Sequence, residues 1–326
     1  MKNALNQLKL QIAYYHRKSY VNAMPKVFGI ELNNVCNLRC RFCPYKIMKR
    51  KKEFMPFNLF KKIIDEAEGT NFVYLHDFGE PLLHPKLVQF INYADNKNIK
   101  VGISTNCTML TPDKSDALLK TNLYLIILCI DGITKATYEK LRIGGNYEKV
   151  VRNVEYFLTR RSLLHHKCRA NVQIIASEYT KKETDAFVKL WKTKYPSIEA
   201  GIKPFDTVGG VIEKSGDNTI DKELKHEKRY PCRWLWHQVQ ILSNGDVTLC
   251  CRDYDGKAVI GNIKKNSLKE IWNSNKMIEE RNRQKNGQYN ELCIKCYEWI
   301  GEKQDNMYPF SMSFVKDVKK FKRGVD

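Results

Sequence analysis

Two alternating hydrophobic patterns along residues 25–203 most strongly limit the fold of this chain of 326 residues. Short apolar, β-branched runs typical of buried strands alternate with stretches in which apolar residues recur as in amphipathic helices. The expected strands are residues 27–32, 72–76, 99–103, 123–130, 170–176 and 198–202, and the expected helices are residues 57–68, 85–96, 111–120, 147–164 and 181–194. Such alternation predicts a parallel sheet with crossover helices.

Six strand–helix units are fewer than the eight of a closed barrel, so we predict an α/β fold built as a partial (β/α)6 barrel. An open doubly wound sheet is the alternative. In both folds the functional loops follow the carboxyl ends of the strands.

The chain divides into five predicted parts. We expect a basic helix at residues 1–24, the barrel at 25–203, a linker at 204–230, a small α+β module at 231–300 and a basic tail at 301–326. Within the module, the Asn244-Gly245 pair separates two short apolar runs, which is the pattern of a β-hairpin.

The composition, 43% hydrophobic and 28% charged residues, is that of an ordinary globular protein. No run approaches the roughly 18 apolar residues of a membrane-spanning helix, and the amino end lacks the apolar core of a secretory signal, so a cytoplasmic location is expected. The net charge is +20, and residues 1–62 hold fourteen Lys and Arg against Glu31 and Glu53. This basic excess attracts phosphates, nucleic acid or an anionic membrane surface, or is simply a solvated surface.

Eleven cysteines are present, and most of them fall into two groups. An odd number in a chain without an export signal argues against a disulfide framework. Clustered thiols in a reducing compartment usually bind metal or take part in chemistry.

The first group, Cys36, Cys40 and Cys43, follows the first expected strand in a C-x3-C-x2-C run. Three thiolates on one loop can hold three irons of a [4Fe–4S] cube, which leaves one iron with an open position for a substrate. Zinc is the alternative, with a distant residue such as His76 as a further ligand, because zinc sites also use cysteine and histidine.

This run resembles the cluster-binding motif of the radical S-adenosylmethionine (SAM) enzymes, in which an aromatic residue precedes the third cysteine, as Phe42 does here. The resemblance implies that Cys36, Cys40 and Cys43 ligate the cluster. It also implies that the amino and carboxylate groups of SAM chelate the remaining iron, with Phe42 beside the adenine.

Two further segments at expected strand ends resemble SAM-binding motifs of the same family. Gly79 and Glu80 stand in a DFGEP segment similar to the family's GGEP motif, which contacts the SAM amino group, although phenylalanine takes the first glycine position. Ser104, Thr105 and Asn106 resemble residues that contact the ribose and carboxylate of SAM. Taken alone, the first segment is a Gly-Pro turn and the second a helix cap.

Arg142 lies in a segment after the fourth expected strand that resembles radical SAM enzymes carrying a C-terminal cluster module. The resemblance implies that Arg142 approaches the SAM carboxylate or the substrate, because a guanidinium binds carboxylates bidentately. We therefore predict Arg142 as a cofactor-binding and catalytic residue. A surface ion pair with Glu139 is the alternative.

The second group of cysteines lies within residues 231–296, which resemble the SPASM/twitch module of radical SAM maturases and dehydrogenases. The resemblance implies one auxiliary [4Fe–4S] cluster, with the ligands Cys232, Cys250, Cys293 and Cys296. The spacing is similar to that of enzymes that oxidise an aminocyclitol alcohol to a ketone. A four-cysteine zinc ribbon is the alternative.

Cys251 stands beside Cys250, and the sequence leaves open which of the two is the ligand. A spare thiol near the reacting centre could donate a hydrogen atom to a substrate radical, as in radical SAM epimerases, so Cys251 is a candidate catalytic residue. Cys107, Cys129 and Cys168 are expected to pack in the core.

The resemblance thus implies a radical SAM oxidoreductase with two [4Fe–4S] clusters, one binding SAM and one auxiliary. Its expected reaction is the two-electron oxidation of a sugar or aminocyclitol-like alcohol. Epimerisation with Cys251 as hydrogen donor and peptide maturation are alternatives within the class. A zinc-binding, nucleic-acid-associated protein is the alternative from another class.

The expected partners are a small-molecule substrate, anionic if the basic patch binds it, and an electron donor such as flavodoxin or ferredoxin. The basic amino end also permits association with a membrane surface or a carrier. Nucleic acid is disfavoured as a partner because the basic runs lack interleaved aromatic residues.

Overall fold

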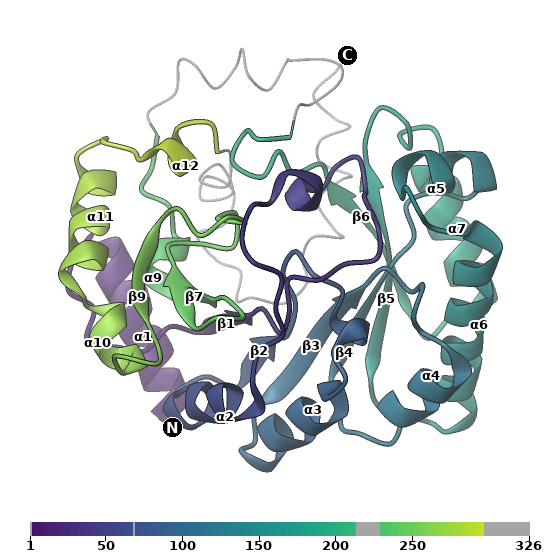
Figure 1. The fold of residues 1–326 in the computed structure, drawn as a ribbon, viewed down its shortest axis with the longest axis horizontal. Helices are drawn as coiled ribbons and strands as arrows, with labels where there is room; N and C mark the ends of the chain where they lie inside the picture. The colour runs from purple at the N-terminus through teal and green to yellow at the C-terminus, as the bar shows by residue number, and fades with distance from the viewer. Residues whose placement is uncertain (1, 68, 213–228, 297–326) are drawn as a thin grey trace.

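The computed structural model describes residues 2–67, 69–212 and 229–296. Its strands form one sheet in the order β6-β5-β4-β3-β2-β1-β7-β8-β9 (Figure 1). The first six strands pair in parallel with their neighbours and are β1 Val27–Ile30, β2 Phe72–Tyr74, β3 Lys100–Thr105, β4 Leu125–Cys129, β5 Arg169–Ala176 and β6 Glu199–Pro204. The predicted α/β class with a partial parallel barrel is confirmed.

Helices pack along the outer side of this parallel region (Figure 1). They are α2 Phe57–Glu66, α3 Leu87–Asn96, α4 Pro112–Leu118, α5 Lys135–Leu141, α6 Tyr147–Leu163 and α7 Thr184–Lys194, and two short 3-10 turns cover Pro44–Ile47 and Pro81–Leu83. Hydrophobic periodicity predicts all of these α-helices except α5, whose seven residues are too few to show a repeat. The Thr134 hydroxyl caps α5 by accepting from the Thr137 amide at 3.2 Å.

Residues alternate along each strand between an apolar outer face and a more polar inner face. In β5, Val172 and Ile174 are buried in the main apolar core under the helices. Gln173 and Ile175 occupy the opposite face, because successive side chains of a strand point to opposite sides. The same parity places five chemically active side chains on the inner face near the carboxyl ends of the strands, namely His76, Ser104, Cys129, Gln173 and Lys203.

The C-terminal module continues the sheet instead of forming a detached domain. Its elements are α9 Trp234–His237, β7 Gln238–Ile241, β8 Asp246–Thr248, β9 Val259–Asn262, α10 Leu268–Trp272, α11 Asn275–Lys285 and α12 Glu291–Ile294. β7 runs parallel to β1 and antiparallel to β8, which confirms the predicted hairpin, with Gly245 in the turn at a φ of 90°. Hydrophobic periodicity cannot reveal the β1–β7 pairing, because the two strands are about 210 residues apart.

The predicted N-terminal helix is shorter than residues 1–24, since α1 covers Lys2–Tyr15 and the chain then turns through Arg17 at a φ of 51°. The tail at 301–326 and residues 213–228 of the predicted linker lie outside the described residues. Among the described helices, none combines the length and the apolarity that crossing a bilayer demands.

A buried ion pair joins the first strand to the C-terminal hairpin. The Glu31 carboxylate, fully buried just after β1, accepts from both terminal nitrogens of Arg50 at 2.9 and 2.6 Å. It also accepts from the amide and hydroxyl of Ser243 at 3.1 and 2.9 Å. Arg50 in turn donates to the Tyr254 carbonyl at 2.8 Å. Four directional bonds therefore satisfy a carboxylate that would be costly to bury alone.

Replacing Arg50 tests this connection. Arg50→Met leaves the Glu31 charge buried without its partner, so the free energy of unfolding should fall by about 3–5 kcal/mol. Lys49→Met is the matched control, because Lys49 is an exposed neighbour whose side chain has no ion pair in the described parts of the chain. Anaerobic urea unfolding measures both variants, and equal losses would contradict the role of Arg50.

Candidate active site

The first cysteine group lies on the loop after β1, at the carboxyl edge of the parallel strands. The loop backbone is bonded to the end of α5, since the amides of Arg39 and Arg41 donate to the carbonyls of Ile143 and Leu141, each at 2.9 Å. The Cys36 amide donates to the Tyr45 hydroxyl, also at 2.9 Å. These bonds hold the three thiols on a fixed loop.

Burial keeps the three thiols neutral when no cation neutralises them. It raises the pKa of Cys40 to about 11 and that of Cys43 to about 12, and it also raises the pKa of Cys36. Two donors act in the opposite direction: Arg142 Nη1 lies 3.8 Å from Cys40 Sγ, and Asn106 Nδ2 lies 3.8 Å from Cys36 Sγ. Three clustered thiols, of which Cys40 is buried and Cys36 and Cys43 are partly buried, fit an iron–sulfur cluster, whose sulfurs accept bonds from such N–H donors.

Arg142 is a buried residue, and its carboxylate partner is Asp131. Arg142 Nε donates to Asp131 Oδ2 at 2.7 Å, and Nη2 lies 2.5 Å from the same oxygen. The guanidinium also lies over the Phe42 ring, 5.1 Å from its centroid. The alternative of a surface ion pair with Glu139 is therefore wrong. The Arg142 guanidinium thus lies between Cys40, a predicted cluster ligand, and Phe42, which is predicted to contact the adenine of SAM.

The Glu80 carboxylate accepts three hydrogen bonds from other groups of the protein. It accepts from the amide of Leu82 at 3.0 Å, the hydroxyl of Thr105 at 2.7 Å and the amide of Asn106 at 2.8 Å. All three bonds lie in the buried interior. These bonds link the loops after β2 and β3, and the SAM contacts expected of Glu80 and Thr105 stay predictions. The Asn106 side chain still faces the Cys36 sulfur.

Gly79 sits where its backbone touches the cysteine loop. A Cβ on Gly79 would come within 2.0 Å of the Asn33 carbonyl oxygen, so only glycine fits. The next residue, Glu80, donates its amide to the Val35 carbonyl at 2.8 Å and accepts at its own carbonyl from Asn33 Nδ2 at 3.1 Å. The glycine therefore allows the β2 loop to approach the loop that carries the thiols.

Ser104 lies on the inner face, with its hydroxyl 3.2 Å from the sulfur of Cys129. Cys107 and Cys168 are fully buried, as expected of core thiols. Cys129 is only partly buried, and the expectation that it packs in the core is wrong. Its apolar neighbours in the sequence, such as Leu128, face the outer core, whereas strand parity turns Cys129 inward.

The four cysteines of the second group line one pocket, together with Arg229, Trp234, Leu235, Leu249, Arg252 and Leu292. Burial and the neighbouring thiols Cys251, Cys293 and Cys296 raise the pKa of Cys250, and burial raises that of Cys293 to about 12. Cys251 does not line this pocket, and its sulfur accepts from Arg252 Nη1 at 3.0 Å. This arrangement favours Cys250 over Cys251 as the fourth ligand.

A small apolar cluster packs against the first group of thiols. It consists of Tyr45, Met48, Val208, Ile212 and Tyr254, and Cys36, Cys43 and Phe78 pack against it. Tyr254 comes from the C-terminal module, shortly after Cys250, and its ring contacts that of Phe78 at 6.0 Å. The cluster covers the first thiol loop on the side that faces the module.

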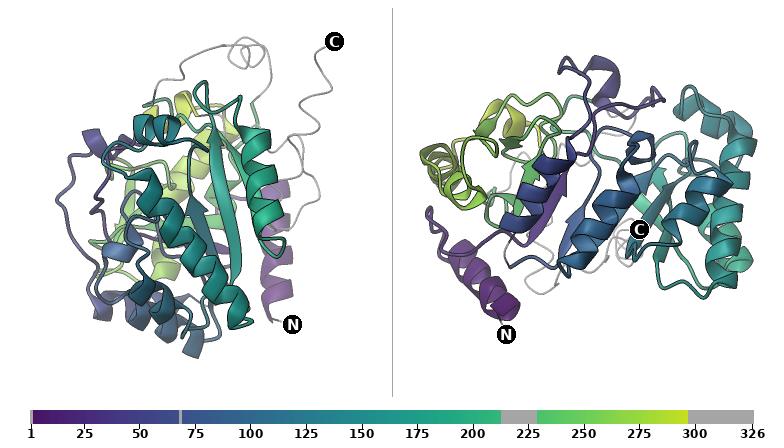
Figure 2. Two further views of the ribbon diagram at one scale, coloured as in Figure 1. Left: turned by 90° about the vertical axis from the view of Figure 1, so that its right-hand side faces the viewer. Right: turned by 60° about the horizontal axis from the view of Figure 1, so that its bottom comes forward.

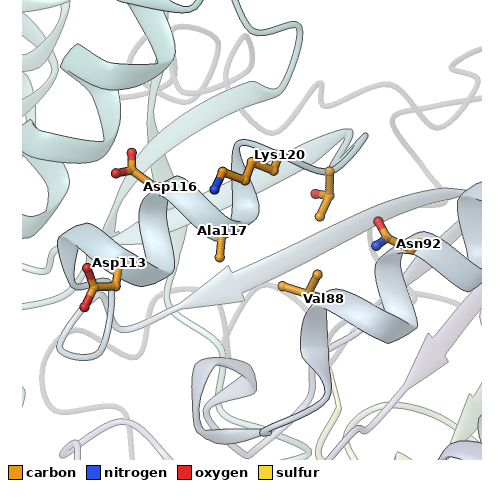
Figure 3. Close-up of a pocket in the computed structure, with 7 residues that line it drawn as sticks. Val88, Asn92, Asp113, Asp116, Ala117 and Lys120 are labelled. Carbon is orange, nitrogen blue, oxygen red and sulfur yellow. The ribbon is translucent and has the colours of Figure 1, made fainter.

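A hollow on the outer surface, between α3 and α4, is a separate feature (Figure 3). It is lined by residues such as Asn92, Asp113 and Lys120 and contains no cysteine. Asp116, which also lines it, is already bonded to Arg160 and Tyr156 at 3.0 Å each. We therefore place the candidate site at the strand ends and not in this hollow.

Several polar residues of the inner face, notably Gln173 and Lys203, are not among the residues predicted from the sequence. Lys203 pairs in register with Ile175, and within the described parts of the chain no carboxylate lies within 4.0 Å of its ammonium. The sequence does contain a signal for this inner face. Polar residues occupy every second position of an otherwise apolar strand, as Asn171 and Gln173 do. His76 belongs to the same face, and its Nδ1 is buried without a hydrogen-bond partner.

Comparison with known proteins assigns the chain to a family. Residues 30–161 match the radical SAM superfamily model, and residues 232–297 match the SPASM iron–sulfur cluster-binding domain. A 2-deoxy-scyllo-inosamine dehydrogenase of Niallia circulans that depends on SAM is 23% identical over 285 residues, which cover 84% of this chain and 94% of that protein.

A second relative, the cofactor-modifying protein of a tungsten-containing aldehyde ferredoxin oxidoreductase from Pyrococcus furiosus, is 27% identical over 165 residues. The match spans 48% of this chain and about half, 46%, of that relative. The crystal structure of BtrN with AdoMet and 2-DOIA superposes with a TM-score of 0.56 at 17% identity, covering 85% of this chain and 94% of that one. At this identity the structural likeness concerns the fold.

The fold and the two thiol sites together define a radical SAM enzyme. More specifically, the chain belongs to the radical SAM superfamily and carries a C-terminal SPASM domain. Its cofactors are SAM and [4Fe–4S] clusters, one of them auxiliary. This result favours iron–sulfur clusters over both zinc alternatives.

Iron content can distinguish the two adjacent cysteines. Cys250→Ala removes a thiol from the second pocket, so the anaerobically reconstituted protein should fall from about eight irons per chain to about four. Cys251→Ala is the matched control and should keep about eight. Iron and acid-labile sulfide analysis measures both variants. Loss of iron in Cys251→Ala with full iron in Cys250→Ala would reverse the assignment.

Proposed function

We propose that this protein is a radical SAM oxidoreductase that removes two electrons from an alcohol of a small sugar or aminocyclitol-like molecule. The similarity to the Niallia circulans dehydrogenase supports this, because it extends over 84% of this chain and 94% of that protein. The presence of a second thiol site in the same chain supports it as well, since a second cluster can accept an electron.

When bound, the first cluster and SAM would supply a 5′-deoxyadenosyl radical able to abstract hydrogen from a C–H bond. We assign Cys36, Cys40 and Cys43 to that cluster. Phe42 and Asn106, next to these thiols, would position SAM, with Gly79 allowing close backbone approach. Arg142, fixed by Asp131, orients the site by holding its guanidinium between Cys40 and Phe42.

The observation that carries the proposal is the polar inner face between the strand ends. Lys203 lies there partly exposed, and among the described residues no carboxylate lies within 4.0 Å of its ammonium. An anionic group of the substrate, such as a phosphate, would complete the pairing. The net charge of +20 agrees with an anionic substrate.

His76 is the candidate proton acceptor for oxidation of the alcohol. Burial and the charge of Lys203 lower the pKa of His76 to about 4, so the imidazole is neutral at pH 7. Its Nδ1 has no hydrogen-bond partner in the described structure and can accept a hydroxyl proton. The apolar cluster of Tyr45, Met48 and Tyr254 would exclude water from this region.

Product analysis tests the proposed reaction. The reconstituted protein, SAM and a reductant are incubated anaerobically with sugar phosphates, nucleotide sugars and aminocyclitols. We expect a ketone product two hydrogens lighter than the substrate and about one 5′-deoxyadenosine per product, because the radical is consumed at each turnover. A product of unchanged mass with inverted stereochemistry would contradict oxidation and identify an epimerase. A modified peptide as the only product would identify a maturase.

The role of Lys203 has its own test. Lys203→Met removes the partner of the substrate anion, so KM should rise about 10- to 100-fold, the loss expected for a charge-assisted hydrogen bond. Lys189→Met is the control, because Lys189 is exposed on α7 and remote from the inner face. Steady-state assays measure both variants. An unchanged KM for Lys203→Met would exclude this role while leaving the oxidation itself untouched.

A further inference from the structure

Helix α1 carries an exposed apolar stripe. The exposed fractions of Leu5, Leu8, Ile12 and Tyr15 are 54%, 52%, 41% and 81%. These positions follow one another at steps of three, four and three residues, which places them on one side of a helix. Single exposed apolar residues are common on protein surfaces, but four in a row on one helix face are not.

The opposite side of α1 is attached to the body of the protein. Leu10 and Ala13 are buried in the main core, and Asn6 exchanges two hydrogen bonds with the backbone of Met24 at 2.8 and 3.0 Å. The Tyr14 hydroxyl donates to the Pro231 carbonyl at 3.0 Å. Because one side is fixed in this way, the stripe is held outward.

The chain that follows α1 is also anchored, so the helix has a defined orientation. Trp236 Nε1 donates to the Lys18 carbonyl at 2.8 Å, and the buried Arg281 donates to the Ser19 carbonyl at 2.9 Å. Figure 2 shows α1 at the edge of the molecule, where it projects beyond its neighbours. A projecting helix presents a convex surface, which a flat and deformable partner can cover more fully than a rigid protein surface.

The amino-terminal segment that carries the stripe has only positive charges. Residues 1–30 contain five Lys and Arg and no Asp or Glu, and the first carboxylate of the chain, Glu31, is buried. Lys9 is exposed beside the stripe. Pairing of two copies through this face would bring like charges together with no carboxylate from either helix to balance them. An anionic partner is therefore favoured over a second copy.

We propose that the outer face of α1 binds the surface of a bilayer containing anionic phospholipid. The helix lies in the plane of the interface, with Leu5, Leu8 and Ile12 among the upper acyl chains and Lys9 at the phosphates. Tyr15 and the exposed Tyr20 suit the interfacial region, because a phenol combines an apolar ring with a polar tip. The carboxyl ends of the parallel strands remain free, since α1 packs against α9, which directly precedes the amino end of β7.

Vesicle sedimentation tests this proposal with the full-length reconstituted protein. We expect binding to vesicles of phosphatidylcholine with about one-third phosphatidylglycerol, weak binding to pure phosphatidylcholine, and release by salt because the lysine contribution is screened. The double variant Leu8→Gln, Ile12→Gln should lose at least about tenfold in affinity, since two apolar side chains no longer enter the bilayer.

Leu190→Gln is the matched control, because Leu190 is an exposed leucine, at 49%, on a different helix, α7. Iron content and SAM cleavage by both proteins should equal those of the parent, which shows that the chain is folded. Equal binding of the double variant and the parent would overturn the proposal. Absence of vesicle binding by the parent protein would also overturn the proposal. This holds whether the protein then proves to be a dimer joined through α1, a complex with an acidic protein, or a monomer in solution.

Discussion

Strand β1 is the element on which both halves of the molecule depend, because it is hydrogen-bonded along both of its edges. On one edge it pairs with β2, whose following loop contains Gly79, and on the other with β7, which leads to Cys250. The loop with the first three thiols leaves directly from β1. Backbone register thus sets the relative positions of the two cysteine groups, and a slip of one residue would exchange the inner and outer faces.

Buried carboxylates stabilise this edge of the sheet, and each has a complete set of partners. Glu31 is paired with Arg50, Asp131 with Arg142, and Glu80 with three neutral donors. An unpartnered carboxylate in such a place would cost several kcal/mol, so these bonds constrain the loops strongly. The result is a site whose loops are held by directional hydrogen bonds and not only by apolar packing, as accurate positioning of a cofactor requires.

The sequence was informative wherever a local repeat or motif carried the signal. Strand–helix alternation predicts the parallel sheet, and the Asn244-Gly245 pair predicts the hairpin, because both depend on residues close together in the chain. The partner of Arg142 could not be predicted. Glu139 is near in sequence, but the chain turns the guanidinium toward Asp131, which lies just after β4.

Side-chain parity explains the remaining differences. Cys129 belongs to an apolar run and was therefore expected in the core. It lies one residue after Leu128, which faces the outer core, so its side chain points to the opposite face, toward Ser104. Glu80 and Thr105 resemble ligand-binding residues by motif, and the structure also bonds them to each other. A motif identifies which residues gather at a site, but contacts between loops decide which of them face the cofactor and which support the others.

Burial of the cysteine side chains also determines that protons are released when a cluster binds. In both cysteine groups desolvation raises the thiol pKa, to about 11 for Cys40 and about 12 for Cys43 and Cys293, so these side chains are neutral at pH 7 unless a metal ion binds them. Iron must therefore displace protons, and cluster binding is coupled to pH. Asp131 balances the charge of Arg142, so the guanidinium can point at Cys40 without leaving a net positive charge in the interior. The cysteine side chains are thus buried as neutral thiols before iron binds. Arg142 is already placed to donate a hydrogen bond to the Cys40 thiolate.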